Sequence, residues 1–127
     1  MREKRKILLA ITGEGSDTNA FRYALNICNR ISAELEILYP SEHAEDLLNQ
    51  FQAELKKEGI DYRLIKGSGC IKEEILDYTS RESDILFVVA GSSDGLNINC
   101  QEADKIIAES WKDLKCPLVI VSDLAAA

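Results

Sequence analysis

Residues 6–40 read KILLAITGEGSDTNAFRYALNICNRISAELEILYP, and this stretch decides the fold. Lys6 to Thr12 and Glu34 to Tyr39 are short, rich in Ile and Leu, and end in turn residues, as buried strands do. Between them, Asp17 to Ile31 places its apolar side chains on one stripe of a helix. Near-continuous apolar runs are typical of parallel strands that are covered on both faces. The stretch therefore predicts a parallel β-α-β unit.

The same alternation continues to the end of the chain. It predicts helices over Glu45 to Glu58, Ile71 to Arg81 and Glu102 to Leu114, and strands over Tyr62 to Lys66, Asp84 to Ala90 and Pro117 to Ser122. Gly59 follows the second helix and is expected to cap it. Strands that alternate with helices in this way predict right-handed crossovers and a parallel sheet with helices on both faces. We expect one domain over residues 1–127, because no linker or repeat interrupts the pattern.

Composition excludes several classes of function. Lys plus Arg number 15 against 22 Asp plus Glu, and the net charge of -7 disfavours nucleic acid and anionic membranes as partners. No apolar run approaches the ~20 residues of a membrane helix, so no membrane insertion is expected. The four cysteines are widely spaced and His43 is the one histidine, which argues against a zinc site. Free thiols without a secretion signal indicate a cytoplasmic protein, with Cys28 and Cys116 filling core space.

These segments, in this order, resemble the universal stress protein family. Residues 6–40 look like its opening unit. GSGCIKEEILDYTSRESDILFVV (67–89) is similar to its glycine turn, Glu-rich helix and Asp-led fourth strand, and CPLVIVS (116–122) to its closing strand. The resemblance covers nearly the whole chain. It implies an α/β fold with a five-stranded parallel sheet of order 3-2-1-4-5, the adenine nucleotide alpha hydrolase-like arrangement, and often a homodimer joined along the last strand.

In such sheets, ligands bind at the carboxyl ends of the strands, where the strand order changes direction. This rule places a candidate site after the first and fourth strands. Glycines there let backbone N–H groups approach phosphate oxygens, and hydroxyls add further donors. The candidate ligand-binding residues are Ile11, Thr12, Gly13, Gly91, Ser92, Ser93 and Gly95.

The loop departs from the motif of the nucleotide-binding relatives. That motif is glycine, two residues, glycine, about nine residues, then glycine followed by serine or threonine. Here three residues separate Gly91 from Gly95, and residues 96–127 contain no glycine. Those relatives often have an aspartate at the end of the first strand, where Thr12 or Gly13 stands here. We interpret the loop as a polar connection, with a small-molecule site as the alternative, and Ser16 as the N-cap of the first helix.

Catalytic motifs are absent from the sequence: there is no G-x-S-x-G, no Walker lysine-serine pair and no H-E-x-x-H. We therefore expect no enzyme and no cofactor, but a universal stress protein-like module that acts in stress response through dimerisation or docking on an unknown protein partner. The dimer is expected to form through Pro117 to Ser122, an apolar strand at a sheet edge. The alternative is a sensor that binds AMP, ATP or another small anion in the cleft after strands 1 and 4.

Overall fold

The computed structural model describes residues 5–12, 17–39, 45–67, 71–82, 84–91, 114 and 116–121. In chain order its elements are β1 (Lys6–Ala10), α1 (Asp17–Ile31), β2 (Glu34–Tyr39), α2 (Glu45–Glu58), β3 (Tyr62–Lys66), α3 (Ile71–Arg81), β4 (Ile85–Ala90) and β5 (Leu118–Ile120). The helix predicted over Glu102 to Leu114 lies outside the described residues, apart from Leu114. None of the helices in the described part combines the length and apolarity that crossing a membrane requires.

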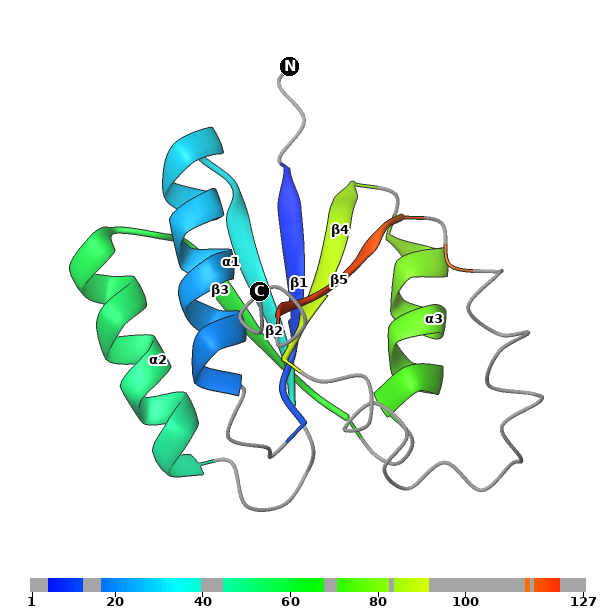
Figure 1. Cartoon of the computed structure of the whole chain (residues 1–127), viewed down its shortest axis with the longest axis horizontal. Helices are drawn as coiled ribbons and strands as arrows, with labels where there is room; N and C mark the ends of the chain where they lie inside the picture. Colours follow the sequence, from blue (N-terminus) through cyan, green and yellow to red (C-terminus); the bar gives the residue numbers. More distant parts are fainter. Residues whose placement is uncertain are drawn as a thin grey trace.

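The strands form one parallel sheet in the order β3-β2-β1-β4-β5. This confirms the predicted order 3-2-1-4-5 and places β1 in the centre. Helices α1 and α2 cover one face of the sheet and α3 covers the other (Figure 1). The fold therefore has the predicted layers, with β3 and β5 at the two edges.

The core consists of two clusters, one on each face of the sheet. From β1 and the residue after it, Ile7, Leu9 and Ile11 pack toward α1 and α2, whereas Leu8 and Ala10 pack toward α3, and all five are fully buried. This two-sided burial explains why the strand is a continuous apolar run rather than an alternating one. The aromatic rings of Phe21 in α1 and Phe51 in α2 stack with their centroids 3.9 Å apart, and this contact joins the two helices.

Both α1 and α2 end in a residue with a left-handed backbone. Gly59 has a φ of 71°, and the N–H groups of Gly59 and Ile60 donate to the carbonyls of Lys56 and Leu55. This arrangement confirms the predicted glycine cap. At the end of α1 a serine has the same role, because Ser32 has a φ of 56° and the next N–H donates back into the helix.

Three strands are shorter than the sequence predicted, and the smallest difference is in β4, which begins at Ile85 instead of Asp84. β1 was predicted to reach Thr12 but ends at Ala10. The Ile11 N–H still donates to the carbonyl of Leu38 in β2, whereas the Thr12 N–H donates to the side chain of Asp17 and so leaves the pairing. β5 spans Leu118–Ile120, so the described residues Pro117 and Val121 are outside the strand that was predicted over Pro117 to Ser122, and Ser122 lies outside the described residues. Pro117 has no N–H, and it contributes its carbonyl, which accepts the Val88 N–H at 2.9 Å.

An irregularity interrupts the pairing of β1 with β4 near their amino ends. Lys6 pairs with Ile85, but Ile7 pairs with Phe87, so Leu86 is an extra residue on β4. Such a bulge is rare between parallel strands and re-aims the side chains beside it. Leu86 is 38 % exposed, and among the described residues it is the one large hydrophobic side chain that is exposed.

Candidate functional site

The predicted ligand site lies at the carboxyl ends of β1 and β4. The pairing of Ala10 with Ala90 brings these ends side by side, and Ile11, Thr12 and Gly91 follow directly. All three of these residues are buried. The remaining predicted site residues, Gly13, Ser92, Ser93 and Gly95, lie outside the described residues. The structure thus brings together the two segments on which the prediction depends, and ligand binding there stays a prediction.

A buried carboxylate organises the end of β1. The Thr12 N–H donates to both oxygens of Asp17, at 3.0 and 3.3 Å, and the Thr12 hydroxyl donates to Oδ1 at 3.0 Å. Asp17 is the first residue of α1 and is 0 % exposed. A carboxylate in the first turn of a helix also complements the positive end of the helix dipole. These contacts tie the start of α1 to the end of the central strand.

The position of this carboxylate was not predicted from the sequence. Residues 12 and 13 are threonine and glycine, not the aspartate of the nucleotide-binding relatives, yet Asp17 brings its side chain back to the same strand end. The available signal was an acidic residue at the start of a helix, a few residues after a strand that ends in threonine. Ser16, the predicted cap of this helix, lies outside the described residues.

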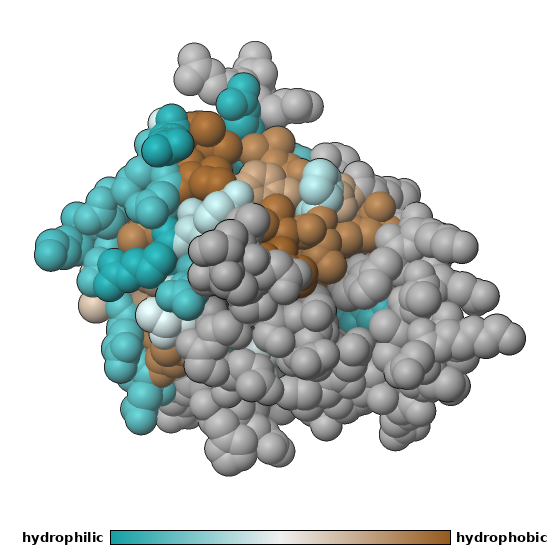
Figure 2. Space-filling view, in the orientation of Figure 1, coloured by the Kyte–Doolittle hydropathy of each residue, from teal (hydrophilic) through white to brown (hydrophobic). Residues whose placement is uncertain are grey.

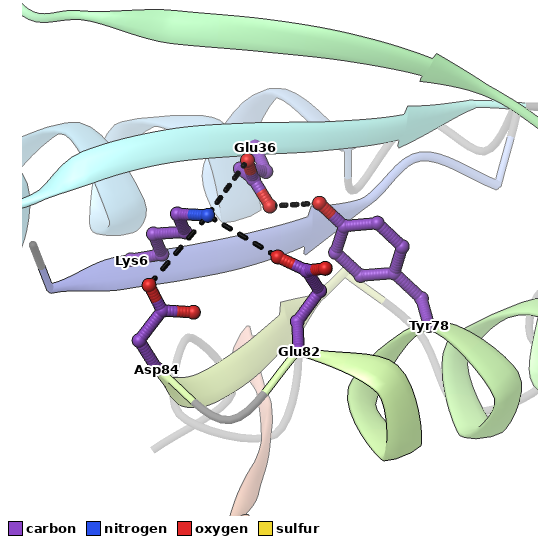
Figure 3. A network of polar contacts seen from close by, with 5 residues as sticks. All are labelled: Lys6, Glu36, Tyr78, Glu82 and Asp84. Carbon is purple, nitrogen blue, oxygen red and sulfur yellow. Dashed lines mark hydrogen bonds and ion pairs between the residues drawn. The ribbon is translucent and has the colours of Figure 1, made fainter.

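A second polar cluster lies at the amino end of β1, far along the strand from the predicted site. The ammonium of Lys6 is 3.3 Å from Glu82, 3.6 Å from Asp84 and 3.8 Å from Glu36. The Tyr78 hydroxyl donates to the other oxygen of Glu36 (Figure 3). The cluster joins β1, β2, the end of α3 and the residue before β4, so its members come from distant parts of the sequence.

Burial and charge shift the pKa values in this cluster. Burial alone would lower the pKa of Lys6, but the hydrogen bond to Glu82 and the charges of Glu36, Asp84 and Glu82 raise it overall. The pKa of Tyr78 is raised by burial and then by its hydrogen bond to Glu36. Lysine therefore stays charged and tyrosine stays protonated at neutral pH. Neither group is suited to act as a general base, and the cluster is best described as a structural ion network.

The described thiols are not activated as nucleophiles, and the described residues form no metal site. Burial raises the pKa of Cys28 to about 12 and also raises that of Cys116. Protonated, sheltered thiols are poor nucleophiles. Lys72 is 2 % exposed, and burial lowers its pKa against the opposing effect of Glu73. Within the described ranges, no group of His, Cys, Asp or Glu side chains could hold a metal ion.

A cleft of about 350 Å³ lies between α1 and α2. The stacked rings of Phe21 and Phe51 line it, together with Arg22 and Glu54, whose charged groups are 3.9 Å apart. Both rings are almost fully buried, so a ligand in this cleft would touch little aromatic surface. Among the predicted site residues that the structure describes, Ile11, Thr12 and Gly91 do not line it.

The other notable surface is hydrophobic. Figure 2 shows brown surface gathered beside α1, over β4 and β5. Half-buried Ile27, Phe87 and Val119 pack at the margin of the core cluster on this face. No helix of the described part covers β5 on this side of the sheet, since α1 and α2 lie toward the opposite edge (Figure 1).

No protein-family model matches the sequence, and no curated protein matches it. Solved structures do match the fold. A universal stress protein in complex with cAMP is 14% identical, has a TM-score of 0.63, and the match covers 91% of this chain and 95% of that chain. The universal stress protein UspA from Lactobacillus plantarum is 18% identical, with a TM-score of 0.56 and coverage of 94% and 99%. A universal stress protein family protein from Arabidopsis thaliana with AMP bound is 16% identical, with a TM-score of 0.59 and coverage of 91% and 90%.

The sheet order, the helical layers and these matches together define the class. The chain has the fold of the universal stress proteins, the adenine nucleotide alpha hydrolase-like α/β arrangement. At identities of 14 to 18%, the likeness shows the fold and leaves the activity to be argued from the residues.

Proposed function

We propose that the protein is a non-enzymatic universal-stress-type module that acts in stress response by forming a homodimer through β5 or by docking on a protein partner. The observation that carries this proposal is the position of β5 at the sheet edge, with a half-buried apolar residue at each of its positions. An edge strand presents unpaired N–H and C=O groups to a second strand. The apolar margin formed by Ile27, Phe87 and Val119 adds hydrophobic surface beside that edge.

The end of β1 also supports a role other than tight nucleotide binding. Both donors of Thr12, its N–H and its hydroxyl, already bond to Asp17. A phosphate would need donors at this point and would meet a carboxylate instead. Together with the missing glycine motif, this favours a module without a cofactor.

A single charge on β5 tests the dimer. Val119 is half-buried and packs at the margin of a core cluster, so Val119→Asp places a carboxylate at the proposed interface, and its melting temperature must show that the variant is folded. Val121 is unsuitable because it is 6 % exposed and belongs to a core cluster, so a charge there would unfold the domain. Lys66→Asp, an exposed position on the opposite edge strand β3, is the matched control. In sedimentation equilibrium, the wild type and Lys66→Asp should be dimers and Val119→Asp a monomer. A dimer that survives Val119→Asp with an unchanged constant would contradict the proposal.

The alternative function is a sensor that binds AMP, ATP or another small anion. It is favoured by the matched structures that hold cAMP and AMP, and by the carboxylate that Asp17 brings to the end of β1. Asp17 is 0 % exposed, so its carboxylate would accept hydroxyl groups of a ribose only after the end of β1 opens.

Denaturing the purified protein and assaying the supernatant for adenine nucleotide separates the two functions, followed by calorimetric titration of the stripped protein with AMP, cAMP and ATP. The module hypothesis expects no carried nucleotide and no binding heat at millimolar ligand. Near-stoichiometric nucleotide would move the protein into the sensor class.

A further inference from the structure

The strand β5 is too short to supply a stable dimer interface by itself. Its three residues extend over about 10 Å at ~3.3 Å per residue. A stable interface buries about 800 Å² on each partner, a patch roughly 28 Å across. If two copies pair along β5, the contact must continue over neighbouring surface, and the nearest continuation along the sheet is the amino end of β4.

The amino end of β4 offers such a surface. Pairing with β5 begins only at Val88, so in the described part of the chain residues 85–87 have a neighbouring strand on the β1 side alone. The bulge places Leu86 in this segment as an exposed side chain, next to half-buried Phe87. A large exposed aliphatic residue beside an open strand edge is a feature that proteins otherwise avoid, because it invites association.

Charged groups surround this apolar segment. Glu82 and Asp84 are 34% and 33% exposed and pair with Lys6, which is 16% exposed. The Lys6 N–H also donates to the carbonyl of Asp84 at 3.2 Å, directly before β4. These contacts hold the chain on the amino-terminal side of the bulge. An apolar centre with a polar margin is the composition of protein interfaces.

We propose that Leu86, turned out by the bulge in β4, is an anchor of the dimer interface and contacts a second copy of the chain. This inference rests on the proposed dimerisation and names a contact that lies outside β5. The occupant is a second copy because the edge of β5 leads directly into this segment and because three residues of strand fall short of the area that a stable dimer needs.

The test compares dimer dissociation constants by sedimentation equilibrium for the full chain. Leu86→Ser removes the apolar contact at an exposed position and is expected to raise the constant at least tenfold. Leu86→Met keeps an apolar side chain of similar size, so its constant should stay within about threefold of the wild type. Ala53→Ser introduces the same hydroxyl at an exposed position of α2 and serves as the control. Melting temperatures confirm that each variant is folded.

The outcomes separate this inference from the proposed function. If Leu86→Ser weakens the dimer and Leu86→Met and Ala53→Ser do not, Leu86 is an anchor. If Val119→Asp gives monomers while Leu86→Ser dimerises like the wild type, the dimer uses β5 without Leu86 and this inference is overturned. A wild type that is monomeric at every concentration overturns both.

Discussion

Removing the carboxylate of Asp17 should destabilise the domain far more than removing an exposed carboxylate at the start of another helix. The change is Asp17→Ala. It deletes the acceptor of the Thr12 N–H and of the Thr12 hydroxyl, in a site where Asp17 is 0 % and Thr12 is 7 % exposed. Water cannot take over these bonds without opening the end of β1.

The size of the effect follows from the donors that are left behind. A buried donor that loses its partner costs about 1–3 kcal/mol. The N–H cannot turn away, whereas the hydroxyl of Thr12 can rotate toward another acceptor. We therefore expect a loss of about 3 kcal/mol for Asp17→Ala. Thr12→Val keeps the backbone bond and removes only the hydroxyl, so it should cost about 1 kcal/mol.

Urea unfolding followed by circular dichroism measures both changes. The matched control is Asp46→Ala, at an exposed position in the first turn of α2, where only a favourable charge near the helix start is lost. If Asp17→Ala costs no more than Asp46→Ala, the carboxylate does not hold the strand end and the argument from burial is refuted.

Three further changes test other parts of the structure. Ser32→Gly should stabilise the domain by about 0.5–1 kcal/mol in urea unfolding, because Ser32 has a φ of 56° that costs a non-glycine residue energy; an unchanged midpoint would contradict this. The raised pKa values of Lys6 and Tyr78 stabilise the fold below the unfolded values of 10.5 and 10.0, and this stability is lost as the pH rises through the folded values. The stability difference between wild type and Lys6→Met should therefore shrink as the pH rises above 10.5, the unfolded pKa of Lys6, and a constant difference would argue against the ion network. Cys28, with its pKa raised to about 12, should resist iodoacetamide in the native protein at neutral pH and react in urea, as peptide mass spectrometry would detect.

The order of the elements could be predicted from the sequence because the strands are buried on both faces. Residues 7–11 are a continuous apolar run, and in residues 35–38 Glu36 is the one polar interruption. A parallel sheet between helical layers buries both segments almost completely. Helix limits were also predictable: α1, α2 and α3 have the expected bounds, since their apolar stripes stop where a cap or a turn follows. The strand order came from the family resemblance, and the structure confirms it.

The ion network around Lys6 could not be predicted, because it joins residues that no local pattern connects, whereas the contact of Asp17 with Thr12 left only the weak signal of an acidic residue at a helix start. Lys6 meets Glu82 across 76 positions of sequence, and Asp17 turns back to Thr12 only once α1 packs on the sheet. The bulge at Leu86 could not be predicted either, because it arises from the pairing of β4 with β1, a strand distant in sequence. The run ILFVVA is uniformly apolar, so nothing in it marks the one residue that the register of β1 leaves outside the pairing.

The central place of β1 has a consequence for synthesis on the ribosome. This strand is made first, yet one of its two neighbours, β4, and the carboxylate of Glu82 are made about 76 residues later. At ~5–20 residues per second, that interval is roughly 4–15 seconds. During this interval the nascent chain can pair β1 with β2 and β2 with β3, but the other side of β1 stays open. The ammonium of Lys6 then lacks two of its three carboxylates, those of Glu82 and Asp84. Completion of the sheet therefore requires the synthesis of β4 and β5, and the interval before it is the period in which the emerging chain would most need a chaperone.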